Sequence, residues 1–194
     1  RFDRDIFLGV MELASTGVVE PAISMIGKET MIIMKEEFPH LSFDPLKDYY
    51  DYVYLAKDLS DLPGKRYLKI RNQLNKFRRE NDYGVESIDG GNISDVMDFH
   101  KGWCLKKRCD KDPFLLAERQ ASMFSLANLE LLGVEGIAIR SGDRIEAYSI
   151  FEPMGEDMAV VHFEKANPDI AGLYPAINNE TAKILDRRFS YINR

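Results

Sequence analysis

One strand, turn and helix pattern near the C-terminal end constrains the fold of this 194-residue chain more than any other feature. Residues 159–163 are an apolar run rich in β-branched side chains, which is typical of a buried strand. An Asn-Pro-Asp turn follows at residues 167–169, and residues 173–187 have the spacing of a helix. Sheets covered by helices are built from such units, so the pattern predicts an α/β (α+β) fold.

Polar and ionisable side chains gather where this strand ends. His162, Glu164, Lys165 and Asn167 occupy positions where a purely structural strand would simply stop. In open α/β sheets, ligands bind beyond the carboxyl ends of strands, so we expect these side chains to face a ligand site. Tyr174 and Asn178 lie in the helix that follows and are close enough in sequence to line the same site. The candidate site residues are therefore His162, Glu164, Lys165, Asn167, Tyr174 and Asn178.

The remaining elements follow from periodicity and from turn residues. A first group is predicted before residue 83: helices at 5–14 and 30–38, strands at 22–26 and 49–54, and a basic helix at 65–79. A second group is predicted after it: strands at 85–88, 134–140, 144–151 and 189–193, with helices at 92–107 and 113–132. We therefore place a boundary between residues 82 and 83.

The predicted basic helix concentrates positive charge in a chain whose net charge is −6. Seven cations and no acid lie between residues 65 and 79: Lys65, Arg66, Lys69, Arg71, Lys76, Arg78 and Arg79. Like charges at helical spacing destabilise a helix, so a bound anion would offset this repulsion. Lys69, Arg71, Asn72 and Asn75 are thus candidate phosphate ligands, although a solvated helix face is the commoner reason for a charge run.

Several classes of protein are disfavoured by composition. No apolar run of about eighteen residues is present, and the N-terminal residues do not resemble a signal peptide. The two cysteines, Cys104 and Cys109, lack the spacing of a zinc site and are too few for a disulfide framework. We therefore expect no metal and a reducing, cytoplasmic location.

Several spaced blocks resemble the C-terminal domain of the phosphatidylglycerol lysyltransferase family. The C-terminal blocks are His162-Phe163-Glu164-Lys165-Ala166-Asn167, Gly172-x-Tyr174, Ile177-Asn178 and Tyr191-Ile192-Asn193-Arg194. The upstream block contains Asp51-Tyr52-Val53-Tyr54, Gly64-Lys65 and Lys69-x-Arg71-Asn72-x-x-Asn75-x-Phe77. Together these blocks extend from about residue 49 to residue 194, which is most of the chain.

The resemblance implies a GNAT-like acyltransferase fold, similar in layout to the Fem transferases that use aminoacyl-tRNA. On this basis, residues 1–82 are expected to be a partial N-terminal GNAT-like unit, and residues 83–194 a complete C-terminal one. Because the chain begins at Arg1 and stops at Arg194, where the family pattern would continue, we expect it to be part of a longer protein. No cofactor is required if the donor is aminoacyl-tRNA.

Aminoacyl transfer needs a positioned donor ester, removal of a proton from the acceptor, and stabilisation of an oxyanion. Glu164 or His162 is the candidate base, Lys165 the candidate partner of negative charge, and Tyr174 the candidate donor to the leaving group. Asn167 and Asn178 are expected to orient substrate. The structural alternatives are a core position for His162, a packing role for Tyr174, and opposite strand faces for the adjacent Glu164 and Lys165.

Three functional hypotheses remain open. The first is transfer of an aminoacyl group from tRNA to a lipid head group, peptide or small amine. The second is an N-acyltransferase that uses coenzyme A; against it, the turn at residues 167–172 has one glycine and a proline, where pyrophosphate binding needs free backbone amides. The third is a non-catalytic module of the same fold that binds anions or nucleic acid.

Overall fold

The computed structural model describes residues 3–16, 22–24 and 26–194, and it divides the chain into the compact units Arg1–Tyr50 and Asp51–Arg194. The described part of the first unit contains helices α1 (Arg4–Ser15) and α2 (Lys28–Glu37) and a short 3-10 helix, η1 (Lys47–Tyr49). Both predicted helices are therefore present in the first unit.

Short-range contacts stabilise the two helices of the first unit. Asp3 caps α1, because its carboxylate accepts hydrogen bonds from the amides of Asp5 and Ile6 at 3.1 Å. The rings of Phe7 and Phe38 are 4.9 Å apart and join the two helices. The strand predicted at 22–26 does not form in residues 22–24 and 26, and Met25 lies outside the described residues.

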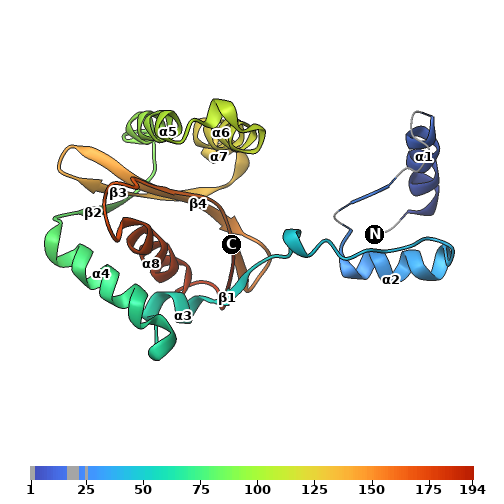
Figure 1. Ribbon diagram of the computed structural model, residues 1–194, viewed down its shortest axis with the longest axis horizontal. Helices are drawn as coiled ribbons and strands as arrows, with labels where there is room; N and C mark the ends of the chain where they lie inside the picture. The colour runs from blue at the N-terminus through green and yellow to red at the C-terminus, as the bar shows by residue number, and fades with distance from the viewer. Residues whose placement is uncertain (1–2, 17–21, 25) are drawn as a thin grey trace. The chain divides into compact units, whose positions relative to one another are not determined.

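A six-stranded sheet organises the second unit, in the order β1-β6-β5-β4-β3-β2 (Figure 1). Its strands are β1 (Val53–Leu55), β2 (Gly84–Ser87), β3 (Glu135–Ser141), β4 (Arg144–Pro153), β5 (Met158–Ala166) and β6 (Tyr191–Asn193). All neighbouring strands are antiparallel except β5 and β6, which are parallel. This parallel pairing is short, since it joins only residues 158–160 to residues 191–193.

Helices cover both faces of the sheet (Figure 1). One face carries α3 (Ala56–Asp61), α4 (Leu68–Glu80) and α8 (Leu173–Leu185). The other face carries α5 (Ile93–Lys107), α6 (Pro113–Ala127) and α7 (Leu129–Leu132). Short 3-10 helices, η2 (Lys65–Tyr67) and η3 (Cys109–Lys111), precede α4 and α6. We call the two sides of the sheet the α8 face and the α5 face.

The central strand β4 shows why both faces are covered. Ala147 and Phe151 belong to the core on the α8 face, whereas Tyr148 and Ile150 belong to the core on the α5 face. All four side chains are buried, and β4 is buried along most of its length, as expected of a strand covered on both sides. The chain is accordingly a mixed α/β protein.

Two predictions about the upstream segment need correction. The predicted strand at 49–54 forms only from Val53 to Leu55, because only these residues pair with β6. The compact unit begins at Asp51 and not at residue 83, because β1 joins the C-terminal sheet and α4 packs on α8. Leu74 and Phe77 of α4 are part of the core on the α8 face.

Among the described residues, no helix combines the length and the hydrophobicity needed to span a lipid bilayer. The same residues contain no group of three or more His, Cys, Asp or Glu side chains arranged to hold a metal ion.

Candidate functional site

A β-bulge in β5 determines which way its polar side chains point. In the ladder with β4, Phe163 pairs with Ile150 and Val161 pairs with Phe151, so His162 is the extra residue between them. A bulge interrupts the alternation of side chains along a strand. As a result, Val161 packs with the core on the α8 face, whereas Phe163, two residues later, packs with the core on the α5 face.

The bulge places Glu164 on the α8 face, where its carboxyl group is almost enclosed. One carboxylate oxygen accepts a hydrogen bond from Arg194 at 2.7 Å, and only 11% of the Glu164 side chain remains exposed. Burial raises the pKa of Glu164, although the charge and hydrogen bond of Arg194 and the side chain of Asn178 act in the opposite direction. A carboxyl group of this kind is suited to proton transfer.

The other oxygen of Glu164, Oε2, is buried and has no hydrogen-bond partner in the described part of the chain. Ser149 is the cross-strand partner of Glu164 in β4, and its hydroxyl is likewise buried and unpaired within the described residues. Directly opposed residues share a face of the sheet. Since buried polar atoms in proteins nearly always have partners, this pair of oxygens marks a place for an ordered water or a polar ligand group.

Two further predicted residues lie on α8. Tyr174 and Asn178 are four residues apart and therefore share one side of that helix. The side chain of Asn178 lies close enough to the Glu164 carboxyl group to lower its pKa, whereas Tyr174, in the first turn of α8, is 37% exposed. The structure thus brings Glu164 and Asn178 together and places Tyr174 one helical turn from Asn178.

Lys165 does not join this cluster. Its ammonium group points to the α5 face, where it donates to Glu118 of α6 at 2.6 Å and lies 4.8 Å from the centre of the Trp103 ring. A common pocket for Glu164 and Lys165 is therefore excluded by the alternation of the strand, and the predicted pairing of the two in one site is wrong. Trp103 itself is a core residue whose indole N–H donates to the carbonyl of Ala166.

His162, the bulged residue, lies at the surface and not in the core. Its Nε2 atom is 2.7 Å from a carboxylate oxygen of Glu152 on β4. Both side chains are about one-third exposed. This pair is on the sheet surface, and His162 has no hydrogen bond to Glu164 in the described residues.

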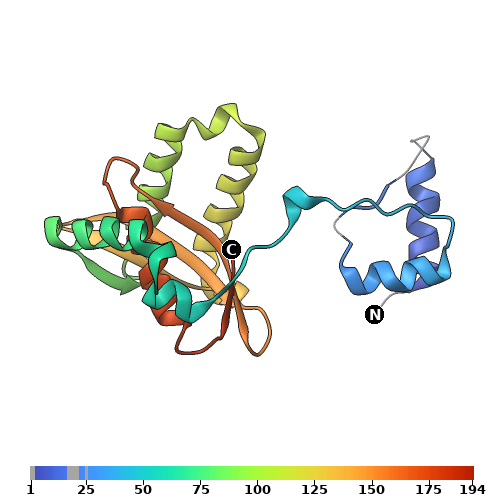
Figure 2. The same ribbon diagram turned by 60° about the horizontal axis from the view of Figure 1, so that its bottom comes forward.

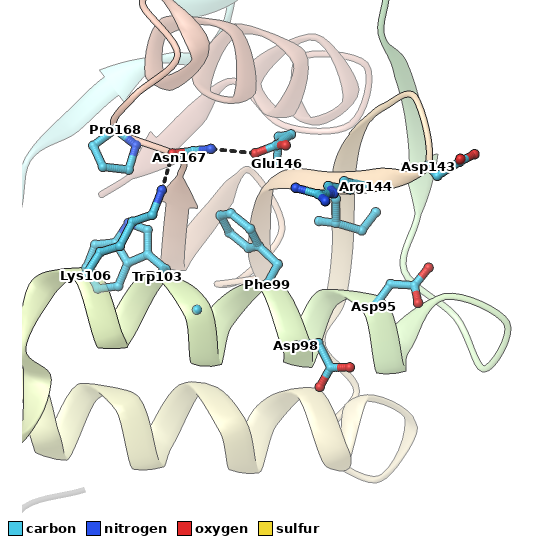
Figure 3. A pocket seen from close by; sticks show the side chains of 12 residues that line it. Asp95, Asp98, Phe99, Trp103, Lys106, Asp143, Arg144, Glu146, Asn167 and Pro168 are labelled. Atoms are coloured by element: carbon cyan, nitrogen blue, oxygen red, sulfur yellow. Dashed lines mark hydrogen bonds between the residues drawn. The ribbon is translucent and has the colours of Figure 1, made fainter.

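Asn167 helps to form a cleft at the carboxyl end of β5. Its amide donates to Glu146 at 2.7 Å, and its side-chain oxygen accepts from Lys106 at 3.3 Å (Figure 3). The cleft has a volume of about 350 Å³, and the side chains of Phe99 and Trp103 from α5 line one wall. Asn167 lines this cleft, whereas Glu164 and Asn178 do not.

The turn between β5 and α8 uses its own polar groups. The amide of Asp169 donates to the side chain of Asn167 at 3.2 Å, and the amides of Ile170 and Leu173 donate to carbonyls within the turn at 3.2 and 3.3 Å. Pro168 has no amide proton. Gly172 adopts φ +86° and lies so close to α4 that an added Cβ would be 2.8 Å from the Gln73 carbonyl oxygen. This glycine is therefore required for packing.

The basic segment formed by η2 and α4 is partly neutralised by contacts that the sequence alone did not predict. Arg66 pairs with Asp58, and Arg78 bonds to Glu180 at 2.8 Å. Arg71 donates to the carbonyl oxygens of Leu62 and Gly64, so its guanidinium holds the preceding loop and is not a free phosphate ligand. Among the predicted phosphate ligands, the side chains that remain exposed on α4 are Lys69, Asn72 and Asn75.

A buried polar cluster on the α5 face also escaped prediction. His100 is completely buried, with Nδ1 2.7 Å from the Tyr148 hydroxyl and Nε2 3.6 Å from the Cys104 sulfur. Burial lowers the pKa of His100 to about 4 and raises that of Cys104 to about 12. His100 is therefore neutral at physiological pH and serves as a hydrogen-bonded core residue. One neighbour, Cys104, lies one turn further along α5, and the other, Tyr148, comes from β4.

The chain is similar to a known protein family and to several solved structures. The family described as "Phosphatidylglycerol lysyltransferase, C-terminal" matches residues 3–193. The crystal structure of a conserved protein of unknown function from Bacteroides thetaiotaomicron is 32% identical, with a TM-score of 0.81, and the match covers 86% of this chain and 57% of that one. No curated protein matches the chain.

Two more distant structures share the fold. L-PGS from Bacillus licheniformis is 12% identical, with a TM-score of 0.51, and the match covers 74% of this chain and 45% of that one. A functionally unknown conserved protein from Staphylococcus epidermidis is also 12% identical, with a TM-score of 0.51, over 96% of this chain and 68% of that one. The chain thus spans little more than half of the Bacteroides protein and less than half of L-PGS.

Proposed function

Because the chain belongs to the phosphatidylglycerol lysyltransferase C-terminal family, we propose that it forms part of a transferase that moves an aminoacyl group from tRNA to a hydroxyl or amine. A lipid head group is the acceptor that the family name favours. The single observation that carries the proposal is the enclosed carboxyl group of Glu164, with one oxygen unpaired in the described residues beside the unpaired hydroxyl of Ser149.

The proposed fold is GNAT-like, as the resemblance implied. The order of elements in the second unit supports this: after β2 come the helices α5, α6 and α7, three antiparallel strands, α8 and a final strand parallel to β5. The parallel pairing joins residues 158–160 to residues 191–193, and Arg194, which directly follows β6, forms the ion pair with Glu164.

In the proposed reaction, Glu164 takes the proton from the acceptor hydroxyl as its oxygen attacks the ester carbonyl carbon of the aminoacyl-tRNA. The ester C–O bond to the tRNA then breaks, and the proton passes to the departing ribose oxygen. A raised pKa makes Glu164 a stronger base than an exposed carboxylate. Arg194 and Asn178 hold the carboxyl group in place, and the Ser149 hydroxyl is positioned to bond a substrate oxygen.

The donor site is assigned to the exposed side of α4. Lys69, Asn72 and Asn75 present one cation and two amides to solvent, which are groups that bind phosphate. The turn before α8 is a poor site for the pyrophosphate of coenzyme A, because Pro168 lacks an amide proton and three other amides bond within the turn. These observations favour a tRNA donor over a coenzyme A thioester.

The donor is tested with the full-length protein, bulk tRNA charged with radiolabelled amino acids, radiolabelled acetyl-CoA, and phosphatidylglycerol as the trial acceptor. We expect label to move from tRNA and not from acetyl-CoA. Lys69→Glu should weaken tRNA binding by about three- to tenfold and reduce its salt dependence, because a phosphate contact is lost. Lys28→Glu, which replaces an exposed lysine of the first unit, is the matched control. Transfer from acetyl-CoA alone would contradict the proposed donor.

A further inference from the structure

The outward side of α6 is apolar, which is unusual for a helix that covers a sheet. Phe114, Ala117, Ala121 and Phe124 are all exposed, and their spacing of three, four and three residues places them in one stripe along the helix. The two rings are strongly exposed, Phe114 at 82% and Phe124 at 59%. A helix that only shields the core would present polar side chains here.

The inward side of the same helix carries polar side chains as well as Leu126, which belongs to the core on the α5 face. Glu118 of α6 forms the ion pair with Lys165 at 2.6 Å, and the buried Ser122 hydroxyl donates to the Glu118 carbonyl at 2.8 Å. In α6, polar side chains thus face inward at Glu118 and Ser122 while bulky apolar ones face solvent. Departures of this kind from the expected pattern point to a surface with a function of its own.

The connection between α5 and α6 extends this surface. It lies at the end of the two helices that is farther from the sheet (Figure 2). We call residues 105–114 the helical tip. Leu105, at its start, is 81% exposed, and Phe114 is at its end. Four cations lie between them: Lys106, Lys107, Arg108 and Lys111.

The charges of the helical tip are only partly used within the protein. Lys106 pairs with Asp169 at 2.6 Å, whereas Arg108 and Lys111 are exposed and form no ion pair within the described residues. The tip also contains the acids Asp110 and Asp112. Asp112 caps α6 by accepting from the amides of Phe114 and Leu115 at 2.8 and 3.2 Å, so its charge faces a helix N-terminus. The tip remains cationic in an otherwise acidic chain.

We propose that the helical tip and the apolar stripe of α6 form a docking surface for an anionic phospholipid bilayer. Exposed phenylalanine and leucine side chains enter the boundary between head groups and acyl chains, as they do in helices that lie in a bilayer interface. The neighbouring lysines and arginine attract the negative head groups. This combination of bulky apolar side chains with cations matches an anionic bilayer better than the apolar surface of a second copy, which would leave the cations unpaired.

This inference does not depend on the proposed reaction. A bilayer can hold the domain through the α5 and α6 side whether or not a lipid accepts the aminoacyl group. Vesicle binding without aminoacyl transfer would support the docking surface and contradict the proposed reaction. Aminoacyl transfer without vesicle binding would contradict the docking surface.

The test is sedimentation of the 194-residue chain with phosphatidylglycerol–phosphatidylcholine vesicles and with phosphatidylcholine vesicles. Three variants are compared with the wild type: Phe114→Ser with Phe124→Ser, Arg108→Glu with Lys111→Glu, and Leu68→Ser with Lys28→Glu as the matched control. Leu68, at the start of α4, is exposed on the opposite side of the sheet, and Lys28 belongs to the first unit. Size-exclusion chromatography with light scattering records the oligomeric state.

We expect the wild type to bind the anionic vesicles, with a loss of binding in high salt. Each of the two surface variants should bind at least about tenfold more weakly. One removes the aromatic rings that enter the bilayer, and the other reverses the charge of the helical tip. The control variant should bind as the wild type does. Absence of binding to anionic vesicles, binding that the surface variants leave unchanged, or a dimer that the Phe114→Ser, Phe124→Ser variant dissociates would each overturn the proposal.

Discussion

Burial raises the pKa of Glu164 and lowers the pKa of His100. The two buried side chains have different roles. The pKa of Glu164 is raised, and one of its oxygens has no partner among the described residues, which suits proton transfer. The pKa of His100 is lowered to about 4, and both ring nitrogens already have neighbours in the core. His100 is therefore kept for stability, and Glu164 is the residue available for chemistry.

The His100 shift predicts acid sensitivity. The folded-state pKa of about 4 lies below the ordinary value of 6.5, so in this range the unfolded chain binds a proton that the folded chain excludes. The stabilising contribution of neutral His100 is complete above the unfolded-state pKa and falls as pH drops from 6.5 toward 4. We expect a loss on the order of 3 kcal/mol across this window.

Urea unfolding of the wild type and of His100→Gln at closely spaced pH values measures this loss. The variant lacks the titrating group, so its free energy of unfolding should change less over the same pH range. Equal slopes for the two proteins would show that His100 is not the origin of the acid sensitivity.

Some of the residues around Glu164 could be predicted from the sequence, and others could not. Glu164 and Asn178 were predicted from their positions at a strand end and on the next helix, and the structure brings them together. Arg194 and Ser149 were missed because their contacts with Glu164 depend on the ladder register and on the pairing of β5 with β6. The side of the strand that Glu164 occupies depends on the bulge at His162, which no local pattern indicated.

The arrangement of secondary-structure elements depends on one close contact between helices. Gly172 begins α8 with φ +86°, and an added Cβ would lie 2.8 Å from the Gln73 carbonyl oxygen and 2.9 Å from Phe77 Cβ. Both contacts belong to α4, so the absence of a side chain lets the two helices approach. The predicted Gly-x-Tyr block thus contains a packing residue.

Gly172→Ala should destabilise the fold by roughly 2–4 kcal/mol, because backbone strain at positive φ adds to overpacking against α4. Gly133→Ala is the matched control, since Gly133 has φ +68° and no atom within 4 Å of an added Cβ. We expect the control to lose only about 1 kcal/mol from backbone strain. Thermal unfolding followed by circular dichroism compares the two, and equal losses would argue against the close contact.

Most helices and strands were predicted from periodicity, and the exceptions are short elements that depend on distant partners. The helices α4, α5 and α8 have long patterns that local sequence determines well. The helix α3 was not predicted, and β1 was placed too early; each is short. Their formation relies on contacts with α8 and β6, which a single sequence does not display.

For the whole molecule, the boundary at residue 51 determines which parts fold together. The strand β1 and helix α4 supply the edge and much of one core face of the C-terminal unit. A chain beginning at Asp51 keeps these elements, whereas one beginning at Tyr83 loses them. The sequence misplaced this boundary because the basic helix was assigned to the preceding unit.

We expect residues 51–194 to unfold in a single cooperative thermal transition, and residues 83–194 to show none. The second piece lacks Leu74 and Phe77 and leaves the core side of α8 uncovered. Near-ultraviolet circular dichroism and differential scanning calorimetry of the two pieces provide the comparison. A cooperative transition in residues 83–194 would support the boundary at residue 82 instead.

The central claim is that Glu164 transfers the proton in an aminoacyl transfer reaction. The most direct measurement is the rate of label transfer from charged tRNA to phosphatidylglycerol by full-length wild type, Glu164→Gln and Glu152→Gln. Glu152 is the matched control, a carboxylate of β4 that pairs with His162 at the sheet surface. We predict a fall of about 10²- to 10⁴-fold for Glu164→Gln at unchanged fold, and a near wild-type rate for Glu152→Gln. A folded Glu164→Gln protein with the wild-type rate would contradict the account.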